Sequence, residues 1–239
     1  MISTLSGPNL SSLIPENGTA HHTSDGPKTH LKTLAEIHSV TVMVVNLYFP
    51  STDVLPANGF GYLIPRAIPF EQNPECALGV VFDSDTITGQ DTVDGTKLTV
   101  MIGGHWWDGM DSYPDSTEGL QMARNVLARH LGITAEPTAT KVGLHKNCIP
   151  QYTVGHSARL REACVELKTS FLGRLAVAGN TYSGVGVADC INGVRDLVTN
   201  TAYNDDAAIG LERSLIPPRY SSVSKIALMR RTQVASRGM

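Results

Sequence analysis

The chain has 239 residues, of which 41% are hydrophobic and 17% charged, and its formal net charge is −3 at pH 7. This composition is ordinary for a globular protein that buries a core as one large domain or two small ones. It excludes a general nucleic-acid footprint, and no apolar run approaches the roughly 18 residues of a membrane span.

The N-terminal part is predicted to be short and irregular. Met1 to Leu5 reads as the end of a strand, as if the domain had started earlier, and it lacks the basic start and apolar block of a signal peptide. Residues 9–14 are expected to form a helical turn, 15–27 a polar loop and 28–37 a helix.

The middle of the chain is predicted to form an antiparallel sheet. Runs rich in β-branched and apolar residues, separated by turn-rich segments, indicate strands. The expected strands are 40–47, 59–65, 78–83, 97–103 and 139–145. The amphipathic segment 116–131 is expected to be a helix, with Ser116 as its N-cap and Gly132 as its C-terminal stop.

The C-terminal part has an α/β character. A helix is expected at 158–170, a buried strand at 175–178 and a second helix from about Ala188 to Thr199. The segment 205–239 contains Pro217-Pro218 and an excess of Arg and Lys. It is therefore expected to be a largely unfolded basic extension.

Neither the cysteines nor the histidines suggest a metal site. The four cysteines are far apart and form no Cys-x-x-Cys pair, which indicates reduced, scattered thiols. The eight histidines include His21-His22 in a polar loop, but no spacing repeats on one helical face. They are interpreted as surface residues rather than metal ligands.

The most informative segment is the glycine-rich turn between the last strand and the last helix. Glycines at 179, 184 and 186 let the backbone approach a flat ligand closely, and the helix directs unpaired N–H groups at whatever lies over the turn. A dinucleotide fingerprint would need glycine where Asp189 stands. Two interpretations stay open from the glycines alone: a packing device, or a seat for an electron-rich ring such as a flavin.

Three further segments combine glycines with apolar or aromatic residues. They are the hairpin edge GFGYLIP at 59–65, the strand end TVMIGGHWW at 99–107, and HKNCIPQY at 145–152. Taken singly, each is typical of turns and core packing.

Taken in order with the glycine turn, these segments resemble the protoporphyrinogen oxidase family, within the flavin amine oxidase superfamily. LGVVFDS at 78–84 and Gly155-His156 also match, and the resemblance covers roughly residues 1–200. The family's Gly-x-Gly-x-x-Gly half has no counterpart here, so the chain looks like the C-terminal half of such an enzyme.

The resemblance implies an α+β fold that is part of an incomplete two-domain flavoprotein. Residues 1–150 would be a portion of the antiparallel substrate-binding domain, and 151–204 the C-terminal strand–turn–helix of the FAD-binding α/β domain. The segment 205–239 does not belong to the resemblance and is expected from its composition to be a disordered basic tail. The implied activity is oxidation of protoporphyrinogen IX to protoporphyrin IX by FAD and molecular oxygen in haem biosynthesis.

The resemblance also implies the site residues. FAD would contact Val185, Gly186 and Val187, with Gly179 and Asp189 in the same turn. The tetrapyrrole would lie between the apolar side chains of Phe60, Leu63 and Met101. No catalytic acid, base or nucleophile is assigned, because holding the macrocycle against the flavin supplies most of the catalysis. No metal is implied.

Location and partners follow from the family alone. The implied location is the mitochondrial inner membrane, bound peripherally, with membrane contact through the missing half and a homodimer as an option. Two other functions stay open: a non-catalytic porphyrin- or partner-binding protein that retains half of the fold, and a flavin amine-oxidase relative with another substrate.

Overall fold

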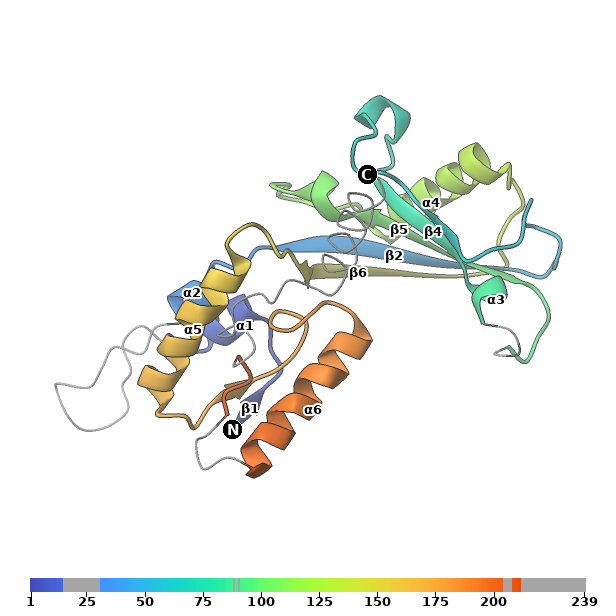
Figure 1. The fold of residues 1–239 in the computed structure, drawn as a ribbon. Helices are drawn as coiled ribbons and strands as arrows, with labels where there is room; N and C mark the ends of the chain where they lie inside the picture. Colours follow the sequence, from blue (N-terminus) through green and yellow to red (C-terminus); the bar gives the residue numbers. More distant parts are fainter. Residues whose placement is uncertain (15–30, 88, 90, 204–207, 212–239) are drawn as a thin grey trace, which may run out of the picture. The chain divides into compact units, whose positions relative to one another are not determined.

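The structure, a computed structural model, describes residues 1–14, 31–87, 89, 91–203 and 208–211. Figure 1 shows these elements as a ribbon. Contacts divide the chain into two units: unit 1 combines residues 1–37 with 152–239, and unit 2 is the continuous stretch 38–151. The predicted loop at 15–27 lies outside the described residues.

Unit 2 is built on a five-stranded antiparallel sheet with the strand order β3-β4-β5-β2-β6 (Figure 1). Its strands are β2 (Ser39–Phe49), β3 (Gly61–Leu63), β4 (Ala77–Phe82), β5 (Thr96–Gly103) and β6 (Ala139–Pro150). The mixed α and β architecture with an antiparallel sheet is therefore confirmed. Two bounds differ from expectation: β3 is shorter than 59–65, and β6 continues past 145 because it pairs with β2 as far as Ser39 opposite Pro150.

Helix α4 (Ser116–Leu131) covers one face of this sheet. The helix begins at a capping box in which Asp115 accepts from the N–H groups of Thr117 and Glu118, and it ends at Gly132 in the left-handed conformation. The predicted helix is confirmed, but its N-cap is Asp115 rather than Ser116. The carboxylate at 115 can accept two backbone donors, which makes it the stronger cap.

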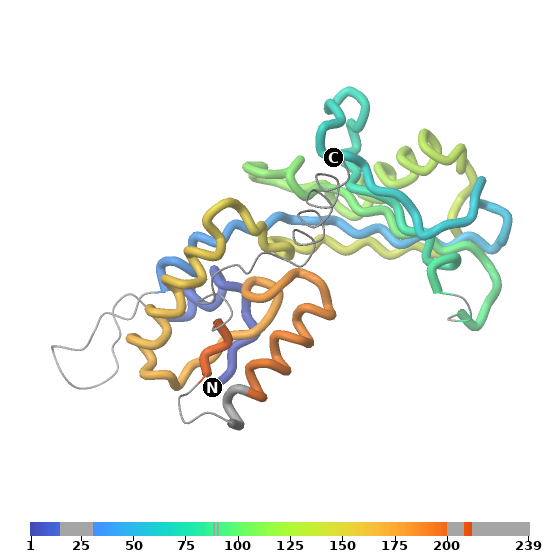
Figure 2. The backbone as a smooth tube through the Cα atoms, in the orientation of Figure 1, coloured from blue at the N-terminus to red at the C-terminus, as the bar shows by residue number. Residues whose placement is uncertain are grey.

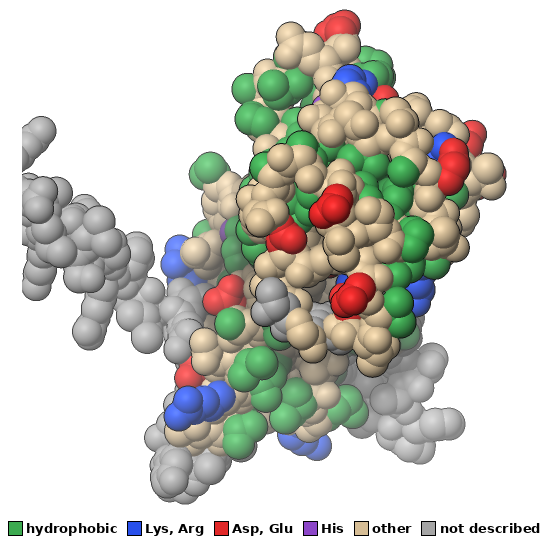
Figure 3. Space-filling model, turned by 90° about the vertical axis from the view of Figure 1, so that its right-hand side faces the viewer, with side chains coloured by type: hydrophobic (Ala, Val, Ile, Leu, Met, Phe, Trp, Pro, Cys, Tyr) green, Lys and Arg blue, Asp and Glu red, His purple; other side chains and the backbone are tan. Residues whose placement is uncertain are grey.

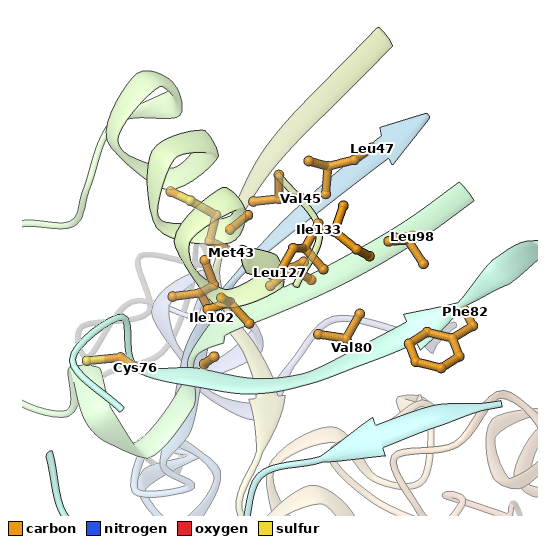
Figure 4. Close-up of a cluster of buried hydrophobic side chains, with 14 of the residues drawn as sticks. Met43, Val45, Leu47, Cys76, Val80, Phe82, Leu98, Ile102, Leu127 and Ile133 are labelled. Atoms are coloured by element: carbon orange, nitrogen blue, oxygen red, sulfur yellow. The ribbon is translucent and has the colours of Figure 1, made fainter. Parts of the chain in front are cut away.

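Apolar side chains from α4 and from alternate positions of the strands form the core of unit 2. Figure 4 shows Leu127 and Ile133 beside side chains of β2, β4 and β5. Labelled strand residues in this cluster are Met43, Val45, Leu47, Val80, Phe82, Leu98 and Ile102. Because side chains alternate along a strand, the intervening residues of the same strands lie on the face that α4 does not cover. Short elements complete the unit: η1 (Phe70–Gln72), α3 (Asp83–Thr86) and η2 (Gly104–Trp107).

Unit 1 brings the beginning of the chain beside its last strand and helices. Strand β1 (Ile2–Ser3) pairs in parallel with β7 (Ala176–Val177). Figure 2 shows the blue N-terminal end of the chain beside orange C-terminal segments. The helices of this unit are α1 (Gly7–Ser12), α2 (Lys32–Ala35), α5 (His156–Phe171) and α6 (Val187–Tyr203). The core that α1, α2 and α5 share with β7 includes Leu10, Leu34, Leu160, Leu167 and Val177. Leu197 of α6 packs against Ala176 and Ala178 in a separate cluster.

This pairing changes the expected domain division. The sequence-based boundary near residue 150 coincides with the change of unit, but residues 1–37 belong with residues after 151 rather than with the sheet. The physical reason is the β1–β7 ladder together with the packing of α1 and α2 into the core of unit 1. Strands this far apart in sequence cannot be paired from local patterns.

The expectation that 205–239 is unfolded needs a correction at four residues. Ile209 and Leu211 are buried in the core of unit 1, and the Ile209 carbonyl accepts from the Val177 N–H at 2.9 Å. Residues 208–211 therefore line β7 on the side away from β1. The rest of the predicted tail, 205–207 and 212–239, lies outside the described residues.

Within the described part of the chain, no helix has the length and apolarity needed to cross a membrane.

Candidate functional site

The glycine-rich turn connects β7 to α6 inside unit 1. It leaves the strand at Gly179, whose φ of +130° is open to glycine alone among common residues, and passes through Gly184 with a φ of +142°. The Tyr182 N–H donates to the Gly179 carbonyl at 3.1 Å, and the Tyr182 hydroxyl donates to the Leu5 carbonyl at 3.0 Å. The turn is thus tied to the strand it leaves and to the chain that follows β1.

Two of the turn's glycines make room for a side chain of the following helix. A Cβ on Gly184 would lie 2.5 Å from the Asp189 Cβ, and a Cβ on Gly186 would lie 3.0 Å from Asp189 Oδ2. Conversely, a Cβ on Gly193 in α6 would lie 2.4 Å from the Ser183 hydroxyl. The turn therefore folds back onto the first turns of α6, and the packing interpretation of these glycines is supported by the geometry.

The same arrangement leaves backbone donors available at the start of α6. The Cys190 N–H donates to the Gly186 carbonyl at 3.0 Å. Among the described residues, the N–H groups of 187–189 have no hydrogen-bond partner, as expected for a first helical turn. The flanking side chains of Val185 and Val187 are 53% and 78% exposed. Backbone N–H groups without partners, next to exposed apolar side chains, can face the edge of a ring that gains negative charge. These residues therefore suit a flavin.

Asp189 lies in the first turn of α6. Its side chain packs against Gly184 and Gly186, where it complements the positive end of the α6 dipole. In this position the Asp189 side chain keeps the turn packed on the helix. It therefore affects the N–H groups at 187–189 only through the backbone conformation that it maintains.

The second group of predicted residues lies on the uncovered face of the unit 2 sheet. Residues that are directly opposite one another in an antiparallel ladder point to the same face. The ladder pairs Leu63 with Gly79, Gly79 with Met101, Met101 with Val44, and Val44 with Gly143. These five residues form one row across all five strands, here called the sheet row.

The side chains of the sheet row are apolar, and two of its five positions are glycines, which have no side chain. A Cβ on Gly79 would lie 3.1 Å from Leu63 Cδ2, so the Leu63 side chain extends over that glycine toward Met101. A Cβ on Gly143 would lie 3.0 Å from His145 Nε2, so the imidazole extends over the second glycine. Leu63 is 78% exposed, while Met101 and Val44 are half-buried. A face of this kind can support a large flat apolar ligand.

Phe60 is not part of the sheet row. It precedes β3, its carbonyl accepts from the Phe82 N–H at 3.0 Å, and its side chain is 70% exposed. This bond places Phe60 beside Phe82, whose own side chain points to the α4-covered core. The structure thus brings Leu63 and Met101 together and leaves Phe60 at the sheet edge. Sequence reasoning missed Val44, Gly79 and Gly143, because only the strand register reveals them.

A cavity of about 360 Å³ lies farther along the same sheet, at the end where β5 begins. Its lining includes Asn46, Tyr48, Asp83, Lys97 and Lys141. The Lys97 ammonium pairs with Asp91 at 2.5 Å, and Thr99 donates to Asp83 at 2.7 Å. The sheet face is therefore polar at this end and apolar at the sheet row.

Exposed apolar side chains occur on other surfaces as well. Figure 3 shows them in green between polar side chains on one face of the molecule. Exposed apolar residues in unit 1 include Val165, Leu172, Ile191 and Val198. Exposure alone therefore does not distinguish the sheet row from the rest of the surface. Among the described residues, no group of three His, Cys, Asp or Glu side chains could hold a metal ion.

The sequence has clear relatives among characterised proteins. It is 38% identical over 158 residues to "Protoporphyrinogen oxidase" of Schizosaccharomyces pombe, covering 65% of this chain and 31% of the relative. It is 39% identical over 168 residues to the human protein of the same name, covering 69% of this chain and 34% of the relative. The chain thus spans about a third of the length of these relatives. No family model matches the chain.

Solved structures share the fold. A crystal structure from Exiguobacterium sp. 255-15, provisionally named protoporphyrinogen oxidase, superposes with a TM-score of 0.64 at 22% identity and covers 83% of this chain and 40% of that chain. Reduced UDP-galactopyranose mutase superposes with a TM-score of 0.55 at 13% identity, covering 75% of this chain and 35% of that chain.

The characterised relatives that the sequence matches are named as oxidases, and the solved structures share the fold of the matched region. Within this class of oxidases the chain belongs to the protoporphyrinogen oxidase family.

Proposed function

We propose that this chain is part of an enzyme that oxidises protoporphyrinogen IX to protoporphyrin IX with FAD and molecular oxygen in haem biosynthesis. The observation that carries the proposal is the match to relatives named protoporphyrinogen oxidase from yeasts, mammals and Dictyostelium discoideum. The sheet row and the donors at the start of α6 support it, because they suit a flat apolar ligand and an electron-rich ring.

In this proposal the turn holds the flavin. The N–H groups at 187–189 would face the ring edge, with Val185, Gly186 and Val187 in contact and Gly179 shaping the entry to the turn. FAD supplies the hydride acceptor and the route of electrons to oxygen. The contribution of this chain is to place fixed donors where negative charge develops, which needs no reorganisation during the reaction.

The sheet row would hold the macrocycle. Leu63, Met101 and Val44 would supply apolar contacts. The two glycines have no side chains that would hold the macrocycle away from the sheet, and Phe60 would add an aromatic side chain at the sheet edge. The charged groups of the macrocycle are propionates at its rim and most of its remaining surface is hydrocarbon, so burial of apolar surface would supply most of the binding free energy, at about 25 cal/mol per Å². No acid or base of this chain is assigned a step.

A further part of the proposal is that the chain acts together with a second flavin-binding portion. Its support is that the matched relatives are about three times as long as the matched region. We further propose a peripheral location on the mitochondrial inner membrane, membrane contact through that second portion, and a homodimer.

Two other functions keep some support. One relative, "Coproporphyrinogen III oxidase" of Bacillus subtilis, is 28% identical over 182 residues, so coproporphyrinogen III is an alternative substrate. A non-catalytic porphyrin-binding protein would use the sheet row alone.

Titration of the purified chain with FAD and with protoporphyrin IX separates these cases. The proposal predicts weak flavin binding and no oxidase activity for the chain alone, and recovery of both when the second portion is added. Stoichiometric FAD on the chain alone would overturn the claim that a second portion is needed. Tight porphyrin binding that persists without any flavin uptake, even with the second portion present, would favour the non-catalytic alternative.

A further inference from the structure

A tyrosine outside the glycine turn is bound directly to it. The Tyr152 hydroxyl donates to the carbonyl of Asn180, 28 positions later in the chain. Asn180 is the second residue of the turn, so this bond fixes the turn where it leaves β7. Tyr152 and the turn both belong to unit 1.

The Tyr152 ring is held in place by His156, four residues later in the chain. The His156 ring stacks on it with the centroids 4.0 Å apart and the planes 13° from parallel. Gly155, with a φ of +90°, turns the chain sharply enough to bring residue 156 back over residue 152. The first residue of α5 therefore acts as a support for the tyrosine.

His156 is buried in unit 1. Its side chain is 7% exposed, and both ring nitrogens are buried without a hydrogen-bond partner. Burial of a polar ring without partners costs free energy, so it needs a compensating contact. The stack on Tyr152 is the aromatic contact that His156 makes.

The other end of the turn influences the pKa of the Tyr152 hydroxyl. Burial raises the pKa of Tyr152, the backbone of Gly184 lowers it, and Cys190 and Asp189 raise it again. The Cys190 thiol in turn donates to the Gly184 carbonyl at 3.6 Å.

We propose that the stacked Tyr152–His156 pair is a positioning element that sets the conformation of the turn at 180–186 and so the direction of the donors at 187–189. The turn is held on one side by Asp189 and Ser183 of its own motif and on the other by Tyr152. The functional role of the donors at 187–189 rests on the proposed flavin site. The effect of the pair on the conformation of the turn does not.

Amide hydrogen exchange on the full chain tests the pair without any flavin. Tyr152→Phe removes the hydroxyl and keeps the stack, and His156→Ala removes the stack. Both should accelerate exchange in peptides covering 180–190 by roughly 2- to 10-fold, the size expected for one lost hydrogen bond. His156→Phe keeps an aromatic ring at 156 and should restore the slow exchange. Tyr48→Phe is the matched control, because the Tyr48 hydroxyl also donates to a backbone carbonyl, that of Asp94 in unit 2.

Wild-type exchange at 180–190 in Tyr152→Phe or in His156→Ala would overturn the proposal, as would failure of His156→Phe to restore slow exchange. An equal acceleration at 180–190 in Tyr48→Phe would also overturn it, because the effect would then be global. FAD titration of the same variants is read separately. These titrations include the second flavin-binding portion, because the chain alone is expected to bind flavin weakly. If neither the wild type nor any variant takes up flavin under these conditions, the proposed function fails, while the exchange result still decides the role of the pair.

Discussion

Asp189 occupies the space that a side chain on Gly184 would need, since a Cβ there would lie 2.5 Å from the Asp189 Cβ. The glycine and the acid are five positions apart and belong to one packed unit. The turn's glycines therefore have a structural cause that is independent of any ligand, and the ligand site consists of what this packing leaves free.

Gly184→Ala should open the turn. Alanine would meet Asp189 and would also have to adopt a φ of +142°, so we expect the unfolding free energy of unit 1 to fall by about 1–3 kcal/mol. Gly109→Ala is the matched control, because Gly109 also has a positive φ, of +78°, but a Cβ on it would meet no atom within 4 Å. Urea unfolding measures both. Equal losses in the two variants would show that Asp189 contributes nothing.

Leu63→Ser should weaken porphyrin binding with little loss of stability. Leu63 is highly exposed, so the folded state loses little burial, while the ligand loses an apolar contact worth about 1–2 kcal/mol. Fluorescence titration with protoporphyrin IX should show an affinity roughly 10-fold lower. Ile87→Ser, at another exposed apolar residue of unit 2, should bind as the wild type does. Loss of affinity in both variants would contradict a site on the sheet row.

Ile209→Ala should destabilise unit 1. Its side chain is fully buried beside β7, and truncating a buried isoleucine costs about 2–5 kcal/mol. Ile191→Ala, on an exposed face of α6 in the same unit, should cost far less. Thermal unfolding compares the two. Similar stabilities would show that residues 208–211 are not part of the core.

Acid should destabilise unit 1 through His156. Burial lowers the pKa of His156, the nearby Arg159 lowers it further, and the backbone of Thr181 opposes them. The folded-state pKa thus lies below the unfolded value of about 6.5. The contribution of the neutral ring is present above that pH and is lost as the pH falls toward the folded-state pKa.

Urea midpoints of the wild type and of His156→Phe, followed from about pH 7.5 to about pH 5, measure this effect. The wild type should lose more stability than the variant over this range. His105 and His130 also have lowered pKa values, but they are present in both proteins and cancel in the comparison. Parallel curves would exclude His156 as the cause.

Local patterns predicted the elements whose signals are local. The helix at 116–131 was predictable because its apolar spacing and its stop at Gly132 lie within the helix itself or next to it. The extension of β6 to Pro150 was not, because the segment HKNCIP lacks a strong alternation and is held by pairing with β2. The same limit hid the burial of Ile209, which depends on a strand about thirty residues earlier in the chain.

The candidate site divides in the same way. Leu63 and Met101 were named from the resemblance, but their common row depends on the register through Gly79. The position of Asp189 against Gly184 could not be predicted, because a spacing of five residues across a turn has no fixed geometry. The Tyr152–Asn180 bond is a tertiary contact with no local signal at all.

A chimeric enzyme tests the central claim most directly. The matched stretch of the Schizosaccharomyces pombe relative, 158 aligned residues, is replaced by the corresponding stretch of this chain, and oxidation of protoporphyrinogen IX is followed by the fluorescence of the product. We expect the chimera to bind FAD and to form protoporphyrin IX, and Gly184→Ala in the same chimera to lose most of the activity. A folded, FAD-loaded chimera that forms no protoporphyrin IX would contradict the proposed function.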